Sequence, residues 1–189
     1  MASRVIAADA CVLLNLLATR RARELLQGLD TTLIATPLTA AQVQYLAGPP
    51  DDDGRPTREP AKLDDLVAGG HLNVKAIPQT ALDLFVRCAA DLHEADASSI
   101  ALAVGFRVAL ATDDALERRV AAREAPGLEI VGTLAFVRRG SAAIGLDHDR
   151  LLKLTRDLRV RGNFLPPRQD PNRDWYQRLL TPAAGKRNR

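Results

Sequence analysis

The sequence predicts an α/β fold in which helices cover both faces of a central parallel sheet. Short aliphatic runs at residues 4–8, 32–35 and 107–111 are each followed by a segment whose apolar residues recur at helical spacing. Strands that alternate with helices in this way are typical of parallel sheets, whose ligands bind beyond the carboxyl ends of the strands. Side chains that directly follow these runs are therefore candidates for a functional site.

In the first half of the chain, hydrophobic spacing and Gly or Pro breaks define the elements. After strand 4–8, the apolar residues Val12, Leu13 and Leu16 predict a helix, and a second helix closes near Gly28. The Pro, Gly and Asp residues of 48–60 predict a flexible, solvent-exposed insertion. The other elements expected here are a strand at 32–35, helices at 38–47 and 61–67, and a strand at 71–77.

In the second half, the same alternation continues. Helices are expected at 80–92 and 95–104, the latter ending at Gly105, and strand 107–111 leads through Thr112 into a helix at 115–123. The last expected elements are a short strand at 128–131 and helices at 132–139 and 149–159.

The length of 189 residues fits one core domain, which we place at 1–145, followed by a helical C-terminal extension at 146–189. The charge is unevenly distributed, because residues 150–189 carry 11 Lys and Arg against 3 Asp and Glu. Clustered cations attract phosphate backbones through counterion release, and this basic extension is a candidate contact for nucleic acid. A solvated charged face is the alternative.

Two classes of protein are disfavoured by the composition. No apolar run reaches the roughly 18 residues of a membrane span, and the acidic Asp9 interrupts the apolar N-terminal stretch, so neither a membrane protein nor a secreted one is expected. The two cysteines, Cys11 and Cys88, lie in apolar segments without metal-type spacing. They predict buried free thiols and a cytoplasmic location.

Four acidic residues lie where strands are expected to meet helices: Asp9, Asp96, Asp113 and Asp114. Taken one at a time, each is explained as the N-cap of a following helix. Capping alone does not explain why several acids are expected at the same edge of the sheet. Carboxylates gathered in one place repel each other, and a hard divalent cation such as Mg2+ or Mn2+ relieves that repulsion. The pattern therefore predicts a metal site.

The chain resembles the PIN-domain ribonucleases, including the VapC-type toxins of bacterial toxin-antitoxin pairs. The resemblance runs over roughly residues 4–160 and is carried by the strand that ends at Asp9, by HEADASSIALA, and by LATDDALERRVA followed by VGTLAFVRRG. It implies a PIN-like three-layer fold with a central parallel sheet and an acidic pocket for Mg2+ or Mn2+. The basic extension follows this domain.

The resemblance also assigns the metal and catalytic residues. Asp9 matches the first acid of the family and Asp96 the acid that opens a helix, with Glu94 as second choice. The final acid follows a Thr, which favours Asp114 over Asp113 and gives Thr112 an orienting role.

One expected acid is absent from this pattern. The family usually has a Glu in the helix after the second strand, where this chain has Gln42. An amide removes one negative charge and cannot act as a base, so weaker metal binding is expected and a second ion becomes doubtful.

The implied function is a Mg2+- or Mn2+-dependent endoribonuclease, as in VapC-like toxins. RNA is the implied substrate, a cognate antitoxin and a second copy of the chain are the implied partners, and no membrane is involved. The alternative favoured by Gln42 is a catalytically degenerate module that binds RNA or protein. A phosphate-accepting receiver-type domain fits less well, because the only lysines before residue 150 are Lys62 and Lys75. Arginines that could contact RNA are Arg118, Arg119, Arg138, Arg139 and those of the extension.

Overall fold

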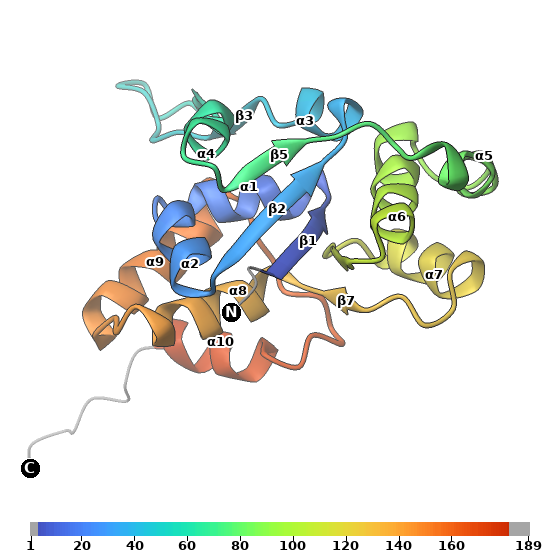
Figure 1. Cartoon of the computed structure of the whole chain (residues 1–189). Helices are drawn as coiled ribbons and strands as arrows, with labels where there is room; N and C mark the ends of the chain where they lie inside the picture. Colours follow the sequence, from blue (N-terminus) through green and yellow to red (C-terminus); the bar gives the residue numbers. More distant parts are fainter. Residues whose placement is uncertain (1–3, 182–189) are drawn as a thin grey trace, which may run out of the picture.

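The computed structural model describes residues 4–181 and contains the predicted parallel sheet (Figure 1). The sheet has five strands in the order β5-β2-β1-β6-β7, and each neighbouring pair is parallel. The predicted α/β class is therefore confirmed. The strands are β1 (Arg4–Ala8), β2 (Thr31–Ala35), β5 (Leu72–Val74), β6 (Ala109–Ala111) and β7 (Ile130–Val131).

Helices cover both faces of this sheet and make it the middle of three layers. Successive strand residues point to opposite faces, so Ile6 and Ala8 of β1 belong to one hydrophobic cluster and Ala7 belongs to the other. The first cluster contains residues of α1 (Ala10–Ala18), α2 (Ala22–Gly28), α4 (Leu63–Ala68) and α8 (Thr133–Ala143). The second contains residues of α5 (Leu82–Ala89), α6 (Glu94–Phe106) and α7 (Ala115–Glu124).

The helix predicted at 38–47 is only partly correct. Helix α3 spans Pro37–Gln42 and ends at Val43, whose φ of −83° and ψ of 76° leave the helical region. The chain then forms β3 (Tyr45–Ala47), which pairs antiparallel with β4 (Arg58–Pro60). The insertion predicted at 48–60 is thus the end of a hairpin and not a free loop, because its last three residues form a strand.

Other differences concern element length. The strands predicted at 71–77, 107–111 and 128–131 are shorter than expected, because the sheet register pairs only Leu72–Val74, Ala109–Ala111 and Ile130–Val131 with neighbouring strands. The helix predicted at 80–92 begins with a 3-10 turn, η1 (Gln79–Ala81), and continues as α5.

The C-terminal extension is packed against the domain as far as residue 181. Helix α9 (His148–Arg161) contributes Leu154 and Leu158 to the first hydrophobic cluster, and α10 (Arg173–Leu180) contributes the buried Tyr176. The ring of Tyr176 lies edge-on to Phe164 at a centroid distance of 5.6 Å. The aromatic residues near the C-terminus therefore serve packing. The rest of the predicted basic tail, residues 182–189, lies outside the described residues.

Two sequence expectations about class are tested directly. No helix within residues 4–181 has the length and apolarity needed to cross a membrane. Both cysteines are free, but only Cys88 is buried, and the expectation of a buried Cys11 is wrong because this residue lies on an exposed position of α1.

Candidate metal centre

Asp9 lies at the carboxyl end of β1, as the sequence predicts. Its backbone N–H donates to the Ala111 carbonyl at 3.0 Å, which extends the pairing of β1 with β6 and sets Asp9 beside Thr112. The Asp9 side chain is 2% exposed and its Oδ1 accepts from the Val12 N–H at 2.6 Å, so it caps helix α1. Burial raises the pKa of Asp9 to about 7, against the lowering effects of the Val12 N–H and the Thr112 hydroxyl.

Asp114 caps α7 in the same manner. Its Oδ1 accepts from the Glu117 N–H at 2.7 Å, and its own N–H donates to the Thr112 hydroxyl at 3.0 Å. The buried Thr112 therefore shapes the turn that leads from β6 to α7 and stands between the two capping acids. Asp114 itself is exposed, which leaves its carboxylate accessible to a ligand from solvent.

Asp113 has a different environment from its neighbour. Its Oδ1 accepts from the Thr133 N–H at 3.0 Å, and its Oδ2 accepts from the Thr133 hydroxyl at 2.5 Å and from the Asn15 side-chain amide at 3.1 Å. Burial raises its pKa, and these donors together with Arg118 lower it. Both oxygens are engaged by the protein, so Asp113 fastens the loop after β6 to α8 and α1.

Asp96 lies in the first turn of α6 and is partly buried. Burial raises its pKa, and the negative charge of Asp114 raises it further. The turn that carries it is anchored by hydroxyl groups, because Ser98 and Ser99 both donate to the Ala95 carbonyl. Thr36, which caps α3, and Thr39 within α3 join this network from the other side. Glu94, the second choice, is exposed.

Glu117 is a buried acid near this edge of the sheet that the sequence analysis missed. It is fully buried in α7, and neither side-chain oxygen accepts a hydrogen bond of good geometry from the protein. Burial raises its pKa well above the ordinary value, and the charge of Asp9 raises it further. The spacing contained a signal, because Glu117 precedes Val120 by three residues and Ala121 by four and so shares their buried face.

The negative charge of Asp9 raises the pKa of Glu117, which shows that the two buried carboxyls lie near each other. Within residues 4–181, however, neither side-chain oxygen of Glu117 has a hydrogen-bond partner. The negative charges of these acids also raise the pKa of the nearby Cys11. Partial burial of its thiol, followed by the charges of Asp9, Asp96, Asp113 and Glu117, raises the pKa of Cys11 to about 12.

The donor chemistry fits a hard divalent cation, although no preformed cage is present. Within residues 4–181, no three His, Cys, Asp or Glu side chains are arranged to hold a metal ion together. Several carboxylate oxygens instead accept hydrogen bonds from the protein, as at Asp9, Asp113 and Asp114. The buried Glu117 oxygens have no cation beside them, and a divalent ion would satisfy them.

Gln42 is the last residue of α3 and is exposed. The helix that carries it is tied to α6 through Thr39, whose hydroxyl lies 3.0 Å from that of Ser99. The side chain of Gln42 thus adds no charge to the acidic cluster.

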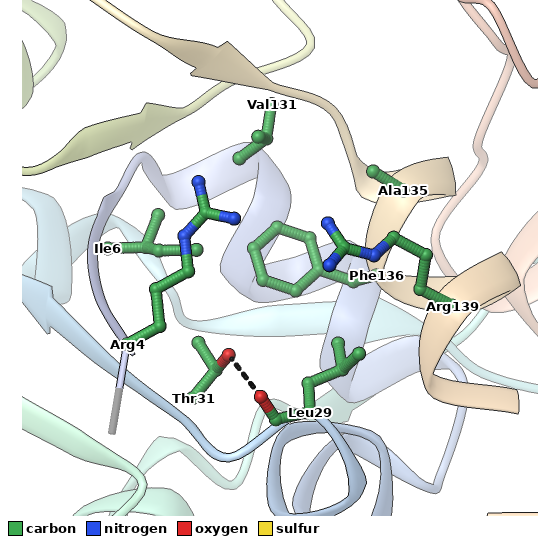
Figure 2. Close-up of a pocket in the computed structure, with 8 residues that line it drawn as sticks. All are labelled: Arg4, Ile6, Leu29, Thr31, Val131, Ala135, Phe136 and Arg139. Atoms are coloured by element: carbon green, nitrogen blue, oxygen red, sulfur yellow. Dashed lines mark hydrogen bonds between the residues drawn. The ribbon is translucent and has the colours of Figure 1, made fainter. Parts of the chain in front are cut away.

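The arginines are divided between structural and accessible positions. Arg118 donates from Nε and Nη2 to the Thr112 carbonyl, and Arg138 lies 5.9 Å from the Trp175 ring, so both have partners within the fold. Arg139 lines a hollow of about 40 Å³ together with Arg4 and Phe136 (Figure 2). That hollow is at the amino ends of β1 and β2, away from the edge that carries the acids.

A larger basic hollow of about 590 Å³ lies between α9 and α10. Arg159, Arg168 and Arg173 line it, and none of its lining residues, all within the described chain, is acidic. The extension therefore presents a concave cationic surface.

Comparison with known proteins identifies the family. The DUF3368 family, described as a PIN domain, matches residues 5–166. The match includes every acid discussed above and extends through α9. A comparison with curated proteins gave no match. PIN domains are generally nucleases that act on RNA and typically use divalent metal ions. With residues 5–166 matched and the parallel sheet in place, the chain belongs to the PIN-domain family.

Proposed function

We propose that the protein is a Mg2+- or Mn2+-dependent endoribonuclease whose cation is held by Asp9, Asp96 and Asp114, with Asp113 in support. The observation that carries this proposal is the buried Asp9 carboxyl beside Glu117, at the carboxyl edge of β1 and β6 in a PIN domain. Two buried acids without a cation are costly, and a divalent ion offsets that cost.

The residues have separable roles in this mechanism. When bound, a divalent cation lowers the pKa of a water molecule and stabilises charge on the phosphate and the leaving 3′ oxygen. Asp9 and Asp114 present carboxylates from helix N-termini, where capping fixes their orientation. Thr112 holds the turn between them. Hydrolysis is expected to leave a 5′ phosphate.

The basic hollow between α9 and α10 supports RNA as the substrate. An acidic pocket repels a polyanion, so cationic surfaces elsewhere must offset that repulsion. Arg168 and Arg173 line this hollow and belong to an extension with a large excess of cations. Phosphate contacts there would hold the strand while the acidic edge acts on it.

The experiment that tests the activity is cleavage of a labelled single-stranded RNA with Mn2+, Mg2+ or EDTA. Wild type is expected to cut only with metal, and Asp9→Asn is expected to lose cleavage while keeping its helix cap. Asp147→Asn, which changes an exposed cap of α9, is the matched control and is expected to cut normally. Equal activity of wild type and Asp9→Asn would refute the assignment.

A VapC-like toxin role, with a cognate antitoxin and a homodimeric assembly, is the finer form of this proposal. It is supported by the resemblance of HEADASSIALA and LATDDALERRVA to that group. Expression of the chain alone should arrest growth of its host, and co-expression of a small neighbouring reading frame should relieve the arrest. Growth arrest that Asp9→Asn does not remove would argue against a nuclease toxin.

A degenerate binding module is the second candidate, and a specific observation favours it. Gln42 stands where the family usually has a Glu, and residues 4–181 contain no preformed three-ligand site. Titration calorimetry with Mn2+ at neutral pH separates the two functions. A nuclease should take up metal stoichiometrically, whereas uptake is not required of a module that only binds RNA or protein.

A further inference from the structure

Glu117 occupies a position that packing alone does not explain. Its backbone N–H donates to Asp114 Oδ1, which places the residue one turn into α7 from the proposed ligand. The side chain is 0% exposed, because it lies on the buried helix face that it shares with the apolar Val120 and Ala121. Both oxygens lack a donor of good geometry in the described chain. An ionised carboxylate in this position is strongly destabilising unless something compensates it.

The residues that shift the pKa of Glu117 show which groups lie near its side chain. Asp9 and Asp96 are the acids that influence it, and Thr112 is the hydroxyl. These residues come from the end of β1, the start of α6 and the end of β6. Within residues 4–181, neither carboxylate oxygen of Glu117 has a hydrogen-bond partner. The fully buried Glu117 carboxyl therefore lies near the proposed metal centre with no partner for its charge.

We propose that Glu117 is a metal-binding carboxylate that supplies the acid missing at position 42. This inference rests on the proposed function, because it assigns a further ligand to the same site. With Glu117 included, four carboxyl side chains belong to the elements that meet at this edge, counting Asp9, Asp96 and Asp114. No three of them form a preformed site within residues 4–181, so a cation would have to draw them together. The fourth comes from α7, whereas Gln42 is carried by α3.

The test compares Mn2+ binding by calorimetry and by the Mn2+-dependent rise in unfolding midpoint, both measured without RNA. Glu117→Gln keeps the size and polarity of the side chain but removes its charge. It is expected to weaken Mn2+ binding by at least about tenfold, the loss seen even when groups outside the ligand shell are removed. Glu124→Gln is the control at the other end of the same helix, where Glu124 pairs with Arg87 and Arg123, and it should bind Mn2+ as wild type does.

Stability in EDTA separates a metal ligand from a structural residue. Because Gln cannot ionise, Glu117→Gln avoids the cost of a buried carboxylate, and its unfolding midpoint at pH 8 should equal or exceed that of wild type. Glu117→Asp keeps the charge but withdraws it by one methylene, and it should also weaken Mn2+ binding.

The outcomes are distinguishable. Wild-type affinity in both Glu117 variants, together with loss of binding in Asp9→Asn, would overturn the role of Glu117 and leave the proposed function intact. Lower stability of Glu117→Gln in EDTA with unchanged Mn2+ affinity would make Glu117 a structural residue. No Mn2+ uptake by wild type would overturn both proposals.

Discussion

Replacement of Asp9 by Asn should stabilise the metal-free protein, and the gain should grow with pH. Burial raises the pKa of Asp9 from 3.8 to about 7, so the folded state holds a proton that the unfolded state releases. Between these two values, stability falls as pH rises, and above pH 7 the full penalty remains. The difference of about 3 pKa units corresponds to about 4 kcal/mol.

Asn mimics the neutral acid, because it cannot ionise and its side-chain oxygen can still accept from the Val12 N–H. The expected gain in the free energy of unfolding for Asp9→Asn is about 1 kcal/mol at pH 4.5 and about 4 kcal/mol at pH 8. Excess Mn2+ should reduce the difference at pH 8, since bound metal stabilises wild type only.

The assay is urea unfolding in EDTA at several pH values, followed by circular dichroism and extrapolated linearly to water. Asp147→Asn makes the same change at an exposed helix cap, where Asp147 Oδ1 accepts from the Arg150 N–H. It should show no comparable gain. A variant Asp9→Asn that is no more stable than wild type at pH 8, or whose gain is the same at pH 4.5, would refute the account of the buried acid.

Two further predictions concern the surroundings of the site. Gly132→Ala should lower stability by about 1–3 kcal/mol in thermal or urea unfolding, because a Cβ would come within 2.9 Å of carboxylate oxygens of Asp113 and Asp170; a neutral effect would mean that these carboxylates move freely. The double change Arg168→Gln and Arg173→Gln should weaken binding of single-stranded RNA in fluorescence titrations. It should also reduce the slope of log K against log salt by about 0.7 for each phosphate that the variant no longer neutralises, and an unchanged slope would place the RNA elsewhere.

The sheet and the position of Asp9 followed from the sequence because they depend on local pattern. An aliphatic run such as 4–8 that is followed by an acid and then by apolar residues at helical spacing predicts a strand, an acid at its carboxyl end and a helix. The hairpin of β3 and β4 did not follow, since the segment 38–47 has helical spacing throughout. Residues 45–47 form a strand because Tyr45 pairs with Pro60 on the other side of the insertion. The spacing of apolar residues does not predict this long-range pairing.

The candidate site was predicted in part for a similar reason. Asp113 and Asp114 are adjacent and equally acidic, so only tertiary contacts separate them, and those contacts engage both oxygens of Asp113. Glu117 was missed because an acid within a polar helix is ordinarily a solvated residue. Its burial depends on how α7 rests against α6 and the sheet, which is a property of the whole fold.

Helix capping and metal binding are compatible roles for the acids at this edge of the sheet. A carboxylate has two oxygens, and Asp9 and Asp114 each use Oδ1 for a backbone N–H of the helix that they begin. The second oxygen of each takes no part in the cap. Capping therefore fixes the orientation of the carboxylate before any cation arrives, so less conformational freedom is lost on binding. By this reasoning, the capping acids Asp9 and Asp114 are favoured as ligands over Asp113, because both oxygens of Asp113 already accept hydrogen bonds from the protein.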